Sequence, residues 1–256
     1  MVKPGNSPHT YEPKPSQMRA ISKADLYFAM DVEFEHVWLK KFQSINKNMK
    51  IVDLDYGIKK MQMEAHSHEE EKHDEHAHHD HEKHDDHEKH EEYDEHTGLD
   101  PHIWTSPQNV KVIAKNIYTA LVKNDMENKA YYTKRYNDFM SHIEQTDAKI
   151  KSILKDTKDG EKFMVFHPAW GYFAAQYHLT QVSIEIQGKN PKPRQVAHLI
   201  NEAKEEKVKA IFTAPEFSES SAKQIARELN VPVIKVSPLN PNWSENLINL
   251  AHAIAK

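Results

Sequence analysis

The sequence contains no cysteine, so it can form no disulfide and offers no thiolate ligand to a metal ion. It also has no apolar stretch that approaches the length of a membrane span, and its opening, MVKPGNSPH, lacks the apolar centre of a signal peptide. A formal net charge of -5 without a basic cluster argues against a nucleic-acid partner. The 256 residues are enough to bury a core in one or two domains.

Histidine, by contrast, is abundant and concentrated. Eleven of the nineteen histidines lie between His66 and His96, where carboxylates fill most of the gaps and only Ala77 and Tyr93 could join a core. Such a composition predicts a mobile loop, and its many imidazoles suit zinc, copper or nickel. The alternatives are a solvated acidic loop or an expression tag. A tag would be terminal and purely histidine, so a metal-handling role is favoured.

The first half of the chain carries signals for strands and helices in alternation. We expect strands over 25–30 and 51–54, and an amphipathic helix over 33–45. A further helix should begin at Ser106, as the cap, and Pro107, at the first helical position. Residues 126–155 contain neither glycine nor proline and predict one long helix that acts as a spine.

The second half alternates more regularly. Strands are predicted over 162–166, 181–186, 209–213 and 231–236. Helices are predicted over 169–177, 193–206, 218–229 and 243–255. This order predicts parallel sheets with right-handed crossovers. The fold class is therefore α/β, with two lobes joined by a long helix: an N-terminal lobe over 1–125, a linking helix over 126–157 and a C-terminal lobe over 158–256.

Three histidines outside the cluster are candidate metal ligands. His167 directly follows a predicted strand, KFMVF, and ligands of open parallel sheets bind beyond the carboxyl ends of the strands. His9 lies in the loop PGNSPHTYEP, and His102 lies in LDPHIWTSP just before a helix. A histidine in such a position, taken singly, is more often a hydrogen-bonded structural residue than a ligand, and the spacing of the three forms no local motif.

The strings PGNSPHTYEPKPSQ, LDPHIWTSPQNV and FHPAWGYFA resemble the three ligand blocks of the zinc- and manganese-binding proteins of ABC importers, called cluster A-I. The resemblance extends over essentially the whole chain, and an acidic, His-rich loop before DPHIW is typical of the zinc-specific members. It implies that His9, His102 and His167 bind the metal in a cleft between the lobes. Three neutral imidazoles favour zinc over the harder manganese.

The function implied by this resemblance is transport rather than catalysis. We expect a monomeric, periplasmic or otherwise extracytoplasmic protein that captures Zn²⁺ and delivers it to the membrane permease of an ABC importer. One alternative is a zinc buffer or chaperone that uses the His-rich loop. Another is a zinc hydrolase, since three histidines with an open position are also the layout of catalytic zinc. Such an enzyme would need Glu216 as its general base.

The sequence departs from the family pattern in two places. Where the family usually has an aspartate ligand before Pro-Leu, this chain has Ser237, so the fourth position is expected to hold water or a carboxylate such as Glu216. The favoured alternative for Glu216 is that it caps the following helix. The chain also begins where the family has already formed a strand and a helix, so the first βα unit of the N-terminal lobe is expected to be missing.

Overall fold

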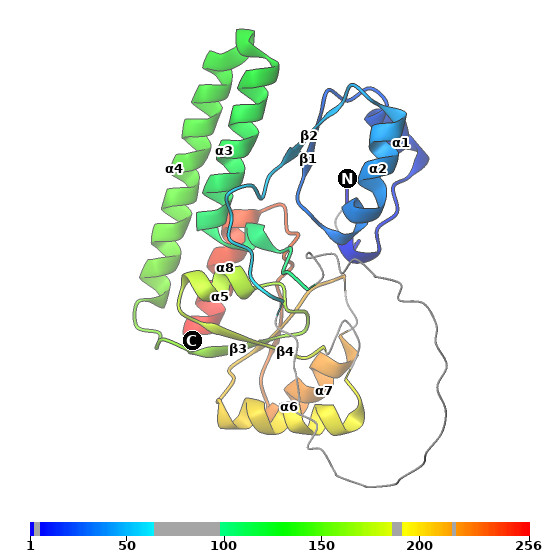
Figure 1. Ribbon diagram of the computed structural model, residues 1–256. Coiled ribbons are helices and arrows are strands. Elements are labelled where there is room, and N and C mark those ends of the chain that lie inside the picture. Colours follow the sequence, from blue (N-terminus) through cyan, green and yellow to red (C-terminus); the bar gives the residue numbers. More distant parts are fainter. Residues whose placement is uncertain (3–5, 64–97, 186–190, 217–218) are drawn as a thin grey trace, which may run out of the picture.

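The computed structural model describes residues 1–2, 6–63, 98–185, 191–216 and 219–256. The His-rich segment 66–96 lies outside this part of the chain, so its predicted mobility and metal binding stay predictions. The described residues form an α/β fold with two separate parallel sheets, which confirms the predicted fold class (Figure 1). No helix in these ranges is long and apolar enough to cross a membrane.

The smaller sheet belongs to the N-terminal lobe. Strand β1 (Leu26–Ala29) pairs in parallel with β2 (Lys50–Asp53), with Leu26 opposite Lys50. The crossover between them is α2 (Glu33–Ile45), which has the predicted bounds, and α1 (Pro15–Ile21) precedes β1. Phe42 is fully buried where α2 covers the sheet. The apolar face of α2 thus contributes Phe34 and Phe42 to the core of this lobe.

The larger sheet forms the C-terminal lobe and has the strand order β4-β3-β5-β6, with every pair parallel. Its strands are β3 (Lys162–Val165), β4 (Thr180–Ser183), β5 (Ile211–Thr213) and β6 (Val233–Lys235). Its helices are α5 (Gly171–Gln176), α6 (Pro193–Glu205), α7 (Ser220–Leu229) and α8 (Trp243–Ala255). The predicted alternation is confirmed, with shorter strands than expected.

Side chains of β3 enter two cores on opposite faces of this sheet. Phe163 and Val165 pack on the side of α5 and α8, whereas Met164 and Phe166 pack on the side of α6 and α7. Successive side chains of a strand point to opposite faces, so a continuous apolar run is what a strand buried on both sides requires. The turn after β3, which carries His167, is thus held by two packed layers.

Two long helices stand beside the sheets as a hairpin, α3 (Pro107–Asn124) and α4 (Lys129–Leu154) (Figure 1). Ser106 caps α3 as predicted, since its hydroxyl oxygen accepts from the backbone N–H of Asn109. The expected single helix over 126–155 is wrong at its start. A short 3₁₀ turn, η3 (Met126–Asn128), precedes α4 because the Asp125 carboxylate accepts from the backbone N–H of Asn128.

The second half of α4 connects the two lobes. Ile143 packs in the core beside α3, and Ile150 and Leu154 pack in the core of the larger sheet beside α8. The first half is more exposed, with Tyr131 and Phe139 at the surface. Because one half of this helix packs in both cores, it holds the lobes together.

Candidate metal centre

Three histidines from three distant segments meet at the junction of the lobes. His9 lies in the 3₁₀ turn η1 (Pro8–Thr10), His102 immediately precedes the turn η2 (Ile103–Thr105), and His167 follows β3. The Nε2 atom of His167 lies 3.2 Å from that of His9 and 3.4 Å from that of His102. One ligand nitrogen from each ring falls within 4.8 Å of the others.

These separations have the size that a zinc ion requires. Zinc binds histidine nitrogen at about 2.0–2.1 Å in a tetrahedron, whose nitrogen–nitrogen edges are then roughly 3.3 Å. Two of the edges in the structure are 3.2 and 3.4 Å long. The three rings could therefore hold one such ion with little movement.

Local backbone interactions fix the segments that carry these rings. The Ser7 hydroxyl accepts from the backbone N–H of His9, and Asp100 accepts from the backbone N–H of His102. The carbonyl oxygen of His167 accepts from the backbone N–H of Ala169 in a tight turn after the strand. Each histidine thus lies in or beside a short hydrogen-bonded turn, as the prolines and the aspartate of these blocks favour.

Each imidazole is also oriented by a carboxylate at its other nitrogen. His9 Nδ1 lies 2.6 Å from Glu33, His102 Nδ1 lies 2.7 Å from Asp100, and His167 Nδ1 lies 2.7 Å from Glu185. A carboxylate only accepts hydrogen bonds, so each Nδ1 carries the proton and each Nε2 of a neutral ring presents a lone pair. This is how outer partners orient metal-binding histidines.

Sequence reasoning missed these three carboxylates, although Asp100 stands two residues before His102 in the block LDPH. Glu33 comes from the first turn of α2, and Glu185 follows β4, the strand that pairs with β3. Strand-end position could have signalled Glu185 once the pairing of β3 with β4 was known.

The electrostatics of the trio call for a cation. In neutral rings with protonated Nδ1, the lone pairs of the Nε2 atoms point into one space, where they repel each other unless a positive ion lies between them. His102 is 1% exposed and His167 is 9% exposed. Burial lowers the pKa of His167, helped by the nearby rings of His102 and His9 and opposed by the hydrogen bond to Glu185. The metal-binding neutral form of His167 is therefore favoured.

Glu33 responds to the same contacts. Burial raises the pKa of this carboxyl, but the contact with His9 outweighs burial, so the pKa lies below its usual value. Glu33 thus stays ionised and keeps His9 oriented.

The cavity enclosed by the trio is the size of a single ion. Its volume is about 10 Å³, and its walls come from both lobes. They are formed by Ser7, Pro8, His9, His102, His167, Glu216, Pro238 and Leu239. This space suits one ion or one water molecule, whereas pockets for organic ligands measure about 300–1,000 Å³.

Glu216 takes a position that differs from the favoured expectation, and Ser237 contacts it. Ser237 accepts from the backbone N–H of Leu239 and donates its hydroxyl to Glu216 Oε1 at 2.9 Å. Helix α7 begins at Ser220 with Glu219 as its cap residue, so the prediction that Glu216 caps this helix is wrong. The turn after β6 brings Ser237 to Glu216, and Glu216 instead forms part of the cavity wall.

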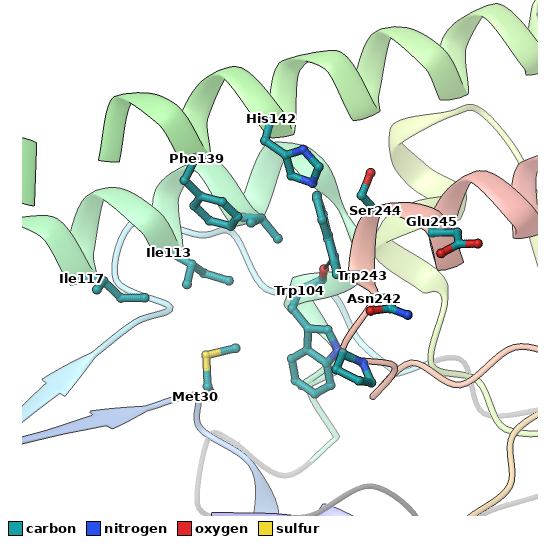
Figure 2. Close-up of a pocket in the computed structure, with 12 residues that line it drawn as sticks. Met30, Trp104, Ile113, Ile117, Phe139, His142, Asn242, Trp243, Ser244 and Glu245 are labelled. Carbon is teal, nitrogen blue, oxygen red and sulfur yellow. Dashed lines mark hydrogen bonds between the residues drawn. The ribbon is translucent and has the colours of Figure 1, made fainter. Parts of the chain in front are cut away.

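A second, larger pocket next to the trio is mainly apolar. Its volume is about 690 Å³. Figure 2 shows Met30, Ile113 and Phe139 on its walls, with His142 of α4 directed toward Trp243. With one histidine and one carboxylate among its walls, it lacks the ligand set of a metal site.

Two indole groups connect the lobes between this pocket and the trio. Trp104 stacks edge-on against His102, with ring centroids 5.4 Å apart, and donates its N–H to the carbonyl of Pro238. Trp243 donates its N–H to the carbonyl of Trp104. Trp170, which follows His167 by three positions, is instead buried in the core beside α5.

A fold of two α/β lobes with a largely buried histidine trio at their junction defines a class of proteins that bind a metal ion between lobes. The family model for the zinc-uptake complex component A, periplasmic, matches residues 1–256, so the chain belongs to this family.

Individual relatives agree with this assignment. A crystal structure of ZnuA is 34% identical with a TM-score of 0.82, over 99% of this chain and 88% of that one. The high-affinity zinc uptake system protein ZnuA of Bacillus subtilis (strain 168) is 30% identical over 226 residues, 87% of this chain and 65% of its own length. The manganese ABC transporter substrate-binding lipoprotein PsaA of Streptococcus anginosus is 24% identical over 247 residues, 91% of this chain and 70% of its own.

Proposed function

We propose that this protein captures one Zn²⁺ outside the membrane through His9, His102 and His167 and delivers it to the permease of an ABC importer. The observation that carries the proposal is the convergence of three Nε2 lone pairs, each oriented by a carboxylate, on a cavity for one ion. Family membership supports the transport role.

Zinc is the preferred cargo in this proposal. Neutral imidazole nitrogens suit zinc, whereas manganese prefers carboxylate and water oxygens. The three carboxylates accept hydrogen bonds from the Nδ1 atoms of the rings. The atoms that face the ion are therefore mainly Nε2 nitrogens. Relatives named for manganese show that the family also includes proteins for the harder ion.

Capture fits the trio better than catalysis does. A zinc hydrolase needs room for a substrate beside the metal, and the cavity of about 10 Å³ offers none. We therefore infer that the protein is not an enzyme. The buffer alternative depends on segment 66–96, outside the described ranges.

The arrangement of lobes is part of the proposal. We infer that residues 1–125 and 158–256 act as two lobes around the ion, with 126–157 as the helix that links them, and that the protein works as a monomer. Support comes from the burial of α4 in both cores and from the wall residues that each lobe contributes. Because each lobe contributes walls to the cavity, a small displacement of one lobe relative to the other would open it.

Zinc titration of the whole protein beside a variant lacking 66–96 tests the function. We expect one tight site in both proteins, measured by competition with a coloured chelator, and a lower total stoichiometry in the variant. Residues Met63 and Gly98, which flank the deletion, are joined by a backbone hydrogen bond, so the ends can be connected by a short turn. Loss of all tight binding in the variant would support the buffer instead.

A further inference from the structure

The cavity has a fourth wall at the ends of neighbouring strands. His167 follows β3, Glu216 follows β5 and Ser237 follows β6, and β5 lies between the other two strands in the sheet. Carboxyl ends of adjacent parallel strands meet at one edge of a sheet. This edge therefore brings the Glu216 carboxylate and the Ser237 hydroxyl to the side of the cavity that His9 and His102 leave open.

The two oxygens of Glu216 have different surroundings. Oε1 accepts the hydroxyl proton of Ser237 at 2.9 Å. The Ser237 oxygen itself accepts from the backbone N–H of Leu239 at 3.1 Å, which directs its proton toward Glu216. Oε2 is buried and has no hydrogen-bond partner, although Glu216 lines the histidine cavity. A buried carboxylate oxygen without a partner is costly, so its position calls for a cation.

We propose that Glu216 Oε2 is the fourth ligand of the bound ion and that Ser237 is the residue that positions it. The inference rests on the proposed function, because it completes the tetrahedron that three histidines leave open. The Glu216 carboxylate is not among the atoms that lie within 4.8 Å of one another, so its side chain swings toward the ion on binding. A carboxylate from β5 thereby takes the role that the resemblance assigned to position 237.

Glu33 is the rival for this position. Its Oε2 is also buried without a partner, and its other oxygen holds His9. Glu33 does not line the cavity, however, whereas Glu216 does. The geometry thus assigns Glu33 to orienting His9 and Glu216 to the ion.

The test compares Glu216→Gln with Glu206→Gln, a control in the same lobe whose carboxylate pairs with Lys162 at the surface. Zinc affinity is measured by chelator competition, and the ligand set by the visible absorption spectrum of the Co²⁺-loaded protein. Glu216→Gln should weaken zinc binding about tenfold to hundredfold and change the Co²⁺ bands. Glu206→Gln should change neither. Ser237→Ala should shift both readouts in the same direction but less, and Ser237→Thr should restore them.

The outcomes separate this inference from the proposed function. If the unmodified protein binds no zinc tightly, the proposed function fails. If it binds tightly and Glu216→Gln keeps both the affinity and the Co²⁺ spectrum, only the role of Glu216 is refuted. The same refutation follows if Glu33→Gln alone changes the spectrum. If circular dichroism shows that Glu216→Gln folds poorly, Glu216→Asp replaces it, since this variant keeps the charge and shortens the reach of the carboxylate. A zinc affinity of Glu216→Asp equal to that of the unmodified protein would equally refute the role of Glu216.

Discussion

At the scale of single residues, His167 is the centre of the trio. Its Nε2 is close to those of both other histidines, and it is the member of the trio that the C-terminal lobe supplies. Replacing it by alanine should weaken zinc binding by orders of magnitude, because affinity depends on the complete ligand set. Chelator competition measures the loss. His36→Ala is the matched control, since His36 pairs with Asp31 at the surface. Equal affinity in His167→Ala would remove His167 from the site.

The lowered pKa of His167 sets the direction of the pH dependence. Only the neutral ring binds zinc, and its ordinary pKa is about 6.5. Because burial lowers the pKa of His167 in the folded protein, protonation of this ring should weaken zinc binding at a lower pH than it would for a free imidazole, whose pKa is about 6.5. Titrations at several pH values measure this. An affinity that is flat down to about pH 5 would contradict histidine as the main ligand.

The free energy of unfolding of the metal-free protein should also depend on pH through His167. Below about pH 6.5 the unfolded chain takes up a proton at His167 more readily than the folded chain does. The contribution of His167 to stability is therefore greatest above this pH and declines as the pH falls toward the lowered pKa. Urea unfolding of His167→Gln and of the unmodified protein at several pH values measures this contribution. The variant should lose less free energy of unfolding on acidification than the unmodified protein does.

At the scale of elements, the two indole hydrogen bonds connect η2 to the turn before α8 and to the first residue of α8. Trp243→Phe keeps most of the apolar packing and removes the bond to the Trp104 carbonyl, which is then left without this partner. We expect a loss of about 1 kcal/mol in the free energy of unfolding. Urea denaturation measures it, with Trp38→Phe in α2 as a control for loss of an indole. An equal loss in both variants would mean that the bond between the lobes contributes nothing.

The elements also show how far sequence reasoning reaches. Apolar periodicity predicted α2 to the residue and the order of the second lobe, because both depend on local patterns. The break before α4 was missed, since one capping carboxylate, Asp125, decides it. The trio was predicted from turns at strand and helix ends together with the family resemblance. Glu33, Glu185 and Glu216 were missed or misassigned, because their roles depend on which strand and helix ends are neighbours in space.

At the scale of the whole molecule, one ion in the proposed site contacts both lobes, so zinc should stabilise them together. Free zinc at 100 times the dissociation constant should add about 2.7 kcal/mol to the free energy of unfolding. Calorimetry should then show a single transition that moves to higher temperature. His167→Ala should show no such shift. Two transitions, with only one of them moved by zinc, would mean that the ion is held by one lobe.

The separation of the three histidines along the chain has a consequence for folding. His9 and His167 are 158 positions apart, and His102 and His167 are 65 apart. Contacts between such distant residues close large loops and form late, after local helices and strand pairs. The trio therefore comes into existence only when both lobes are complete. Zinc held at this site would then report that the newly made chain has finished folding, and a half-folded chain would carry no cargo there.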